Sequence, residues 1–323
     1  MAVLNEAAAD WLRQHHGIIT AARLSRCGIT HWTRKQLVHD GVLLTVHKGV
    51  YRVATQPVTL ESRCAALCAF QPKGIITGPT AGVLRGLRRM QLPRSTGSDG
   101  GDTTTIHFAT PHGRPAALDG VVMRQSTIIQ RTDIQRRADG INIASPWRLA
   151  FDLASDLQAE DLESVIEQIL EQRLCQFVTL ARTARRLARP ARPGSSAFVA
   201  ALAGRVPGGP IESHPELRVA KALHAAGIPI LVQATWLDLP NGRRIRLDMS
   251  VEEIRWGVEV DVHPDHFLQY GTADRRRDRL CHLIGWQVER VTIVDLLDLT
   301  ALIAELVALY HRRVAALAGR SSC

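Results

Sequence analysis

Apolar and polar positions alternate most regularly between Arg244 and Asp261, where the pattern predicts two short β-strands joined by a polar turn. Side chains along a strand point alternately to its two faces. The apolar face of the first strand holds Ile245, Leu247 and Met249, and that of the second holds Trp256, Val258, Val260 and Val262. Packing these faces together brings the carboxylates of Asp248, Glu259 and Asp261 onto one common face, with His263 beyond them.

The first ninety residues have the pattern of three short helices followed by a β-hairpin. We expect helices over residues 5–16, 21–27 and 31–39, the last two capped by Thr20 and Thr30 and ended by Gly28 and Gly41. Strands over 42–46 and 50–53 flank a turn at 47–49. Three helices and a hairpin make a winged helix, a helix-turn-helix variant whose third helix enters the major groove of DNA.

Polar positions of the third helix and the hairpin are the candidate DNA contacts. The helix offers His31, Arg34 and Lys35, and the hairpin offers Lys48 and Arg52, which we expect to reach phosphate. The alternative is a winged helix that contacts protein instead of DNA.

The centre of the chain predicts a mixed α+β region between two linkers. Residues 91–104 predict a flexible linker, because they are rich in Gly, Ser, Thr and Asp. Strands follow at 105–109 and 120–124, then a helix capped by Ser145 with Pro146 in its first turn, and an amphipathic helix over about 160–174. Arg148 and Asp152, four residues apart, predict a local ion pair. Residues 179–210 predict a second linker with a short helix.

The last third predicts helices around the acidic hairpin. One helix opens at Ser213 and ends at Gly227; another runs from Ala273 to Ile284, before a strand over 286–291 and a terminal helix capped by Asp295. Ser213 and Glu216 have capping-box spacing, which by itself explains both residues. The helix over 273–284 carries four arginines that would balance the acids or hold phosphate: Arg275, Arg276, Arg277 and Arg279.

These elements predict an α/β protein, α+β overall, with three domains. A winged helix spans residues 1–90, a mixed α+β domain spans 105–178, a linker spans 179–210 and an α/β domain spans 211–323. A chain of 323 residues has room for two or three domains of ordinary size.

Charge and composition point to a cytoplasmic protein with a nucleic-acid partner. Residues 1–90 hold 12 Lys and Arg against 4 Asp and Glu, so they supply +8 of the net charge of +9. This excess favours phosphate binding, although a basic surface without a partner is the alternative. We expect no membrane contact, because no apolar run reaches about 18 residues and no signal-peptide pattern is present. Scattered cysteines suit a reducing compartment, and Cys64 and Cys68 are expected to be buried thiols.

Three carboxylates on one strand face resist ionising together unless a positive group lies among them. A divalent cation such as Mg²⁺ or Mn²⁺ prefers oxygen ligands, and a metal there can activate water against a phosphodiester. This chemistry points to Asp248, Glu259 and Asp261 as metal ligands. The competing interpretation is a solvated acidic face that pairs with nearby arginines.

The order and spacing of these residues resemble the PD-(D/E)xK nuclease core and, more narrowly, the very-short-patch-repair-like endonuclease domains. The resemblance covers about residues 212–300 and is carried by Glu216, Arg246-Leu-Asp248, Val258-Glu-Val-Asp261, His266, Asp274-Arg-Arg-Arg-Asp278 and Gly285-Trp-Gln-Val-Glu-Arg290. It implies a restriction-endonuclease-like fold in which Glu216 is an outer acid of a metal site and His266 positions water. Two positions depart from the pattern: Asp261 stands where the general pattern has Lys, and Val262 stands where Gly usually follows the acid.

The N-terminal segment, over about residues 5–90, resembles AbiEi-type antitoxins of type IV toxin–antitoxin systems, which repress their own operons. The matching residues are Gly17-Ile-Ile-Thr20, Gly28-Ile-Thr30, Gly41-Val-Leu and Lys48-Gly-Val-Tyr-Arg52, and Ile143-Ala-Ser-Pro-Trp-Arg-Leu-Ala-Phe-Asp152 extends the likeness. This resemblance implies double-stranded DNA and a cognate toxin as partners.

Two functions are therefore expected. The first is a Mg²⁺- or Mn²⁺-dependent endonuclease that hydrolyses DNA phosphodiester bonds with Asp248, Glu259, Asp261, Glu216 and His266 as its catalytic set. The second is a transcriptional regulator of antitoxin type, in which the nuclease-like fold binds without cleaving. The missing Lys favours the second, and the retained acids favour the first.

Overall fold

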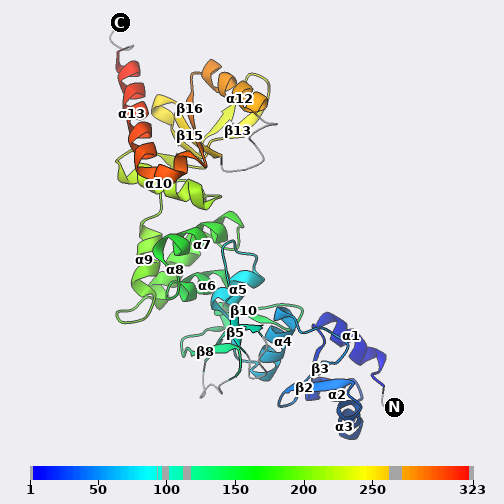
Figure 1. Ribbon diagram of the computed structural model, residues 1–323. Coiled ribbons are helices and arrows are strands. Elements are labelled where there is room, and N and C mark those ends of the chain that lie inside the picture. The colour runs from blue at the N-terminus through cyan, green and yellow to red at the C-terminus, as the bar shows by residue number, and fades with distance from the viewer. Residues whose placement is uncertain (1–2, 93, 97–101, 112–117, 262–270, 320–323) are drawn as a thin grey trace. The chain divides into compact units, whose positions relative to one another are not determined.

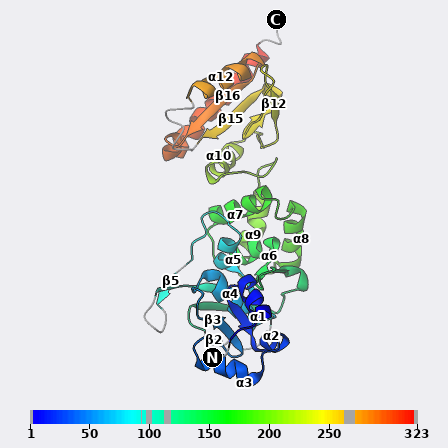
Figure 2. The ribbon, with the colours of Figure 1, turned by 90° about the vertical axis from the view of Figure 1, so that its right-hand side faces the viewer.

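The computed structural model describes residues 3–92, 94–96, 102–111, 118–261 and 271–319 and divides the chain into two compact units (Figures 1 and 2). Unit 1 comprises Met1–Gln158 and Phe177–Phe198, and unit 2 comprises Ala159–Gln176 and Val199–Cys323. The chain is a mixed α/β protein, α+β overall, as the sequence predicted. Across the described residues, no helix is both long and apolar enough to cross a membrane.

Unit 1 begins with three helices and a three-stranded antiparallel sheet. In chain order these are α1 (Glu6–Gln14), β1 (Ile18–Thr20), α2 (Ala21–Arg26), α3 (His31–His39), β2 (Leu43–His47) and β3 (Val50–Val53), with strand order β1-β3-β2. The expected helices and hairpin are confirmed, and Thr20 and Thr30 cap their helices by accepting from the N–H groups of Arg23 and Thr33, both at 3.1 Å. The sequence did not predict β1, because a strand of three residues is too short to show alternation.

A five-stranded sheet follows, with strand order β8-β7-β4-β10-β9. Its elements are α4 (Leu60–Phe70), β4 (Ile75–Ile76), α5 (Gly78–Leu84), β7 (Ile106–Thr110), β8 (Val121–Gln125), η1 (Arg131–Asp133), β9 (Ile134–Arg136), β10 (Asn142–Ala144) and α6 (Pro146–Leu153). β4 lies inside the span expected for the winged helix, 1–90, yet it pairs with β7 and β10 of the expected middle domain, 105–178. Cys64 and Cys68 are buried on α4, as expected.

The two segments expected as linkers contain regular structure. Residues 91–104 include the paired strands β5 (Arg94–Thr96) and β6 (Asp102–Thr104). Residues 179–210 include most of α8 (Phe177–Leu187) and all of α9 (Ser195–Ala203). α8 belongs to unit 1, so the chain returns to that unit after α7 (Ala159–Glu171) of unit 2. The sequence suggested a linker because Arg, Pro and Gly dominate its composition. The spaced apolar residues among them, which include the buried Leu180 and Leu187, were therefore not recognised as one face of a helix.

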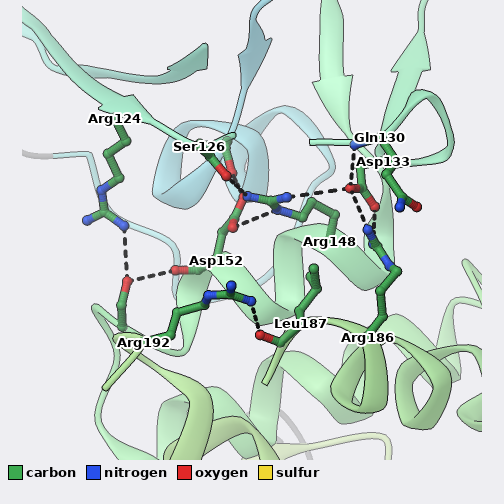
Figure 3. Close-up of polar contacts among 11 residues, drawn as sticks. Arg124, Ser126, Gln130, Asp133, Arg148, Asp152, Arg186, Leu187 and Arg192 are labelled. Carbon is green, nitrogen blue, oxygen red and sulfur yellow. Dashed lines mark hydrogen bonds and ion pairs between the residues drawn. The ribbon is translucent and has the colours of Figure 1, made fainter. Parts of the chain in front are cut away.

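A charge network joins the helices of unit 1 (Figure 3). Asp133 is fully buried and pairs with Arg148 of α6, at 3.5 Å, and with Arg186 of α8. Arg148 also donates to Asp152 Oδ1 at 2.8 Å, which confirms the predicted local ion pair, and to Ser126 Oγ at 3.1 Å. Positive and negative charges therefore balance in this part of the protein.

Replacing the central carboxylate of this network tests its contribution to stability. We expect Asp133→Ala to lower the free energy of unfolding by about 3 kcal/mol, because it leaves Arg148 buried beside a lost partner. Urea unfolding followed by circular dichroism measures the change. Asp156→Ala is the control: it removes the more exposed pair with Arg124, at 2.6 Å, and should cost less than about 1 kcal/mol. Equal losses in the two variants would contradict a central role for Asp133.

Unit 2 is built on a four-stranded sheet with order β11-β14-β15-β16 and a separate two-stranded ribbon, β12–β13. Its elements are α7, α10 (His214–Ala225), β11 (Leu231–Val232), β12 (Trp236–Asp238), β13 (Arg244–Arg246), β14 (Met249–Val251), η2 (Glu252–Ile254), β15 (Trp256–Asp261), α12 (Gly271–Leu283), β16 (Gln287–Thr292), η3 (Asp295–Asp298) and α13 (Leu299–Ala318). One sheet face packs against α10 and α13, and the other carries α12 and the ribbon (Figure 1).

The predicted hairpin is present, but its first strand is divided in two. β14 pairs with β15 in the register Met249↔Val258, whereas β13 pairs with β12. Leu247 and Met249, expected on one face, pack into different apolar clusters because the chain changes direction between them. Gly257 leaves room for Leu247, since a Cβ there would lie 2.8 Å from Leu247 Cδ1.

The terminal helix begins later than the sequence predicted. Asp295, expected as its cap, instead accepts from the N–H of Thr292 at 2.7 Å and lies in η3. Asp298 caps α13 by accepting from Ala301 N–H at 3.0 Å. Both aspartates suit a helix start, so spacing alone could not distinguish them.

Candidate functional site

Three buried or half-buried carboxylates of unit 2 come together from separate elements. Glu216 lies in the first turn of α10, Asp248 lies between β13 and β14, and Glu259 lies near the end of β15. Glu216 and Glu259 are 8% and 6% exposed. The β14–β15 register continued by one residue places Asp248 opposite Glu259, and Asp248 Oδ2 accepts from Val260 N–H at 2.9 Å. The hairpin therefore holds two of the acids side by side.

Gln233 joins the third acid to this pair. Its Nε2 donates to Glu216 Oε2 at 3.1 Å and to Asp248 Oδ1 at 3.0 Å. Gln233 is buried and has a positive φ of 50°, a conformation that is uncommon for residues other than glycine. Its backbone N–H donates to Asp248 O at 2.8 Å. Such backbone strain persists only where the surroundings fix it, and it is frequent at functional sites.

Ser213 and Glu216 do not form the reciprocal capping box that their spacing predicted. Ser213 Oγ accepts from Glu216 N–H at 3.3 Å, which is the expected first half. The Glu216 carboxylate, however, accepts from the N–H of Glu212, one residue before Ser213, at 3.3 Å. The Glu216 carboxylate thus contacts Gln233 as well as the helix start, so the capping explanation holds in part and the metal-site role stays a prediction.

Glu259 faces two arginines. Arg277 of α12 forms an ion pair with Glu259 Oε1, and Arg290 of β16 lies 4.0 Å from Glu259 Oε2. Arg290 also pairs with Asp278 of α12 at 3.1 Å, so part of its charge is shared. The arginine run of α12 was expected to balance the acids or hold phosphate, and Arg277 balances an acid.

Burial raises the pKa of all three acids. Burial, followed by the charge of Asp248, raises the pKa of Glu216 to about 7. Burial also raises the pKa of Glu259 to about 7; Arg277 opposes this rise and Asp248 adds to it. The pKa of Asp248 is raised by burial too, against the hydrogen bonds from Val260 and Gln233. Negative charge is therefore incompletely compensated at this point.

The remaining predicted residues of this site lie at its margin. Asp261 is half-buried at the end of β15, two residues after Glu259 and on the same strand face. His263 and His266 fall in 262–270, outside the described residues. The side chain of Arg275, in α12, is not described either. Arg276 and Arg279 are exposed on α12. Hence the structure joins Glu216, Asp248 and Glu259, while the sequence grouped Asp248, Glu259 and Asp261.

The donor set suits a hard cation, because all its ligating atoms are oxygens and their charge is under-compensated. Two of those oxygens, on Glu216 and Asp248, already accept from Gln233. Within the residues that the structure describes, no group of three or more His, Cys, Asp or Glu is arranged to hold a metal ion. The atoms are thus of the kind that Mg²⁺ or Mn²⁺ prefers, but their described arrangement is not that of a metal site. Binding would require Gln233 to release at least one carboxylate oxygen.

The DNA-contact candidates of unit 1 divide into exposed and internally bonded groups. His31 and Lys35 are exposed on α3, and Lys48 is exposed in the turn between β2 and β3. Arg34 is half-buried with its guanidinium 5.8 Å from the centre of the Tyr51 ring. Arg52 lies in the central strand β3 and donates to the carbonyls of Val53, at 3.4 Å, and Gln56. Arg52 thus supports the hairpin and does not project from its turn.

Sequence reasoning missed Gln233 and Arg290. Arg290 belongs to the segment that resembles the nuclease domains, but its pairing with Glu259 was not predicted. A basic residue in the neighbouring strand is a natural ion-pair partner for Glu259. Gln233 carried no signal, because a single Gln between an apolar run and Ala-Thr matches no motif. Only the fold shows that β14 and the start of the ribbon place it between two acids.

No protein-family model matches this sequence, and no curated protein matches it either.

The raised pKa of Glu216 predicts a stability that falls as pH rises. Between about pH 4.5 and 7 the folded protein keeps a proton that the unfolded chain has released, so the free energy of unfolding decreases across this window and then levels off. Glu216→Gln should flatten the decrease and at pH 8 should be more stable than the wild type by on the order of 2 kcal/mol.

Calorimetry of the full chain in EDTA at pH 5, 6.5 and 8 measures this difference. Glu305→Gln, which changes an exposed glutamate of α13, is the matched control and should follow the wild type. An unchanged pH dependence in Glu216→Gln would show that Glu216 ionises in the folded protein as it does in the unfolded chain.

Proposed function

We propose that this protein binds double-stranded DNA through α1–α3 and the β2–β3 hairpin and carries in unit 2 a metal-dependent site that hydrolyses DNA phosphodiester bonds. The observation that carries the proposal is the burial of Glu216, Asp248 and Glu259 in one cluster, where burial and then the charge of Asp248 raise the pKa of both glutamates. Such perturbed acids are typical of sites that bind a cation. Mg²⁺ or Mn²⁺ would lower the pKa of a bound water and offset phosphate charge.

The residues of unit 2 have distinct roles in this proposal. Glu216, Asp248, Glu259 and Asp261 supply oxygen ligands, and His266 positions water. Arg277 stabilises the ionised form of Glu259 while the cation is absent. Arg276 and Arg279, exposed on α12, attract the DNA backbone. The restriction-endonuclease-like fold remains part of the proposal and is supported by the order of α10, the β14–β15 hairpin and the parallel strand β16.

The DNA-binding part rests on topology and charge. A winged helix in residues 1–90 is supported by the order helix, strand, helix, helix and hairpin and by the sheet order β1-β3-β2. α3 would enter the major groove, with His31, Arg34 and Lys35 near the bases and Lys48 at phosphate. The +8 charge of residues 1–90 favours DNA over a protein partner.

A second candidate function is a regulator of antitoxin type that binds DNA, together with a cognate toxin, and does not cleave. The specific observation in its favour is that each acid already has a protein partner: Gln233 for Glu216 and Asp248, and Arg277 for Glu259. In this function the acidic cluster is a remnant of a nuclease. Catalysis would have been lost because Asp261 stands where the nuclease pattern has Lys.

Neutralising α3 tests DNA binding. Lys35→Ala should weaken binding to duplex DNA of any sequence and reduce the slope of log K against log salt by about 0.9, the amount for one phosphate contact. Arg34→Ala should instead change the preference among sequences. Fluorescence anisotropy with labelled duplexes at several salt concentrations measures both. Lys73→Ala, an exposed lysine between α4 and β4, is the control. If Lys35→Ala and Lys73→Ala keep the wild-type slope, α3 is not the DNA-binding helix.

Loss of one acid tests hydrolysis. With Mg²⁺ or Mn²⁺ at pH 8, wild-type protein should nick supercoiled plasmid and Glu259→Gln should not, because the cation loses a ligand. The same cations should raise the melting temperature of the wild type and not of Asp248→Asn, since a ligand that binds only the folded state stabilises it. Equal background nicking by both proteins, with duplex binding intact, would favour the regulator.

A further inference from the structure

The β12–β13 ribbon has one face that builds the core and one that does not. Its inner face buries Leu237 and Leu239 with Leu247 against Cys281 and Trp286 of the α12 side. On the outer face Trp236 is 50% exposed, although the ribbon's apolar cluster is complete without it. Half of the Trp236 side chain is thus open to contact with a partner outside the chain.

Two arginines accompany this indole. The strand register pairs Trp236 with Arg246 and Asp238 with Arg244. The guanidinium carbons of Arg244 and Arg246 lie 5.2 Å and 5.5 Å from the centre of the Trp236 ring, within the range of cation–π attraction. Arg243 is exposed in the turn beside them. Arg244 also pairs with Asp238 at 3.4 Å, and Arg246 pairs with Glu212. The outer face therefore presents an aromatic ring together with arginines, two of which share their charge with acids.

The ribbon begins at the acidic cluster. Gln233, which bridges Glu216 and Asp248, lies three residues before Trp236, about 10 Å along an extended chain. Leu247 N–H donates to Thr235 O at 3.1 Å, so the two strands stay paired down to the acids. A second connection runs from Arg246 to Glu212, whose N–H donates to Glu216. The ribbon and the acidic cluster are thus connected through Gln233 and through Glu212.

An exposed aromatic ring among arginines suits a nucleic-acid strand with unpaired bases. Every base offers a face for stacking, and the arginines attract the phosphates between stacked bases. In a duplex the base faces are already stacked on one another, so the Trp236 ring cannot use them without opening the helix. A distance of about 10 Å corresponds to roughly three nucleotide steps of a stacked strand, and to fewer steps of an extended one. A base on Trp236 would therefore place the neighbouring phosphodiesters near the acids.

We propose that the outer face of the β12–β13 ribbon binds single-stranded DNA by stacking a base on Trp236, with Arg244 and Arg246 at the phosphates, so that the acidic cluster acts on DNA that contains an unpaired stretch. The substrate assignment rests on the proposed hydrolytic function, whereas the binding assignment does not. The charged surface of unit 1 would then recruit the duplex part of the same substrate.

Binding to a 20-nucleotide strand that contains 2-aminopurine tests the proposal, with the full-length protein in EDTA so that no cleavage occurs. Stacking on Trp236 should quench the probe, and Trp236→Ala should weaken binding about 5- to 150-fold, the range for one stacked base. Trp236→Phe should retain most of the affinity. Arg244→Ala should reduce the salt slope by about 0.7, the value for one contact on a single strand. Arg312→Ala, an exposed arginine of α13, is the charge control.

A duplex of the same sequence separates the possible outcomes. Trp236→Ala should bind it within about twofold of the wild type, because α3 is intact. Wild-type affinity of Trp236→Ala for the single strand, or an equal loss on single strand and duplex, would overturn the proposal. Failure of plasmid nicking with the stacking result intact would remove the hydrolytic function and leave the binding site. Nicking by Trp236→Ala, together with normal single-strand binding by the same variant, would remove the stacking site and leave the hydrolytic function.

Discussion

The burial of more negative than positive charge at one point of unit 2 is the constraint on which the rest of that unit depends. Glu216, Asp248 and Glu259 are taken from water by the packing of α10, the β14–β15 hairpin and α12, and their nearest cation is Arg277. The neutral amide of Gln233 also contacts these acids. The positive φ of Gln233 costs about 1 kcal/mol or more of conformational energy. Buried carboxylates without a matching charge retain protons or attract a cation. Either outcome makes this cluster responsive to its surroundings, which an evenly paired network is not.

Unit 1 shows the contrasting case. Asp133 is more deeply buried than Glu216, Asp248 or Glu259, but Arg148 and Arg186 both face it, and Asp152 pairs with Arg148 as well. These charges cancel within the network, and all of them join η1, α6 and α8. A pocket of about 790 Å³ lies beside the network and is lined by both arginines and acids, so its charge selects no particular ligand. The two clusters therefore differ in how far arginines offset their buried acids.

Much of the fold was predictable from local sequence, and the missing parts have physical causes. Thr20, Thr30 and the glycines that follow their helices act within a few residues, so the helices and hairpin of residues 5–53 could be read directly. The acidic hairpin was also predictable, because alternation over β15 is strict. The division of its partner strand at Leu247 was not, since it depends on a second apolar cluster formed with Cys281 and Trp286, far along the chain. The role of Gln233 depends on tertiary contacts from α10 and β14, and no spacing rule contains them.

Asp248 shows why one architecture supports two candidate functions. Its Oδ2 takes the N–H of Val260 and so supports the end of the β14–β15 pairing, a role that needs no ligand. Its Oδ1 accepts only from a side-chain amide, which can turn away at the cost of hydrogen bonds that a cation or its water would replace. The carboxylate is thus half structural and half exchangeable. Gln233, which donates to Asp248 Oδ1, also lies just before the ribbon that carries Trp236. In the proposed function, ligands at the acids and on the ribbon's outer face would therefore both approach Gln233, whose φ is positive. The positive φ of Gln233 therefore lies where the acidic cluster meets the start of the ribbon, and the proposed cation would compete with the Gln233 amide for the carboxylate oxygens there.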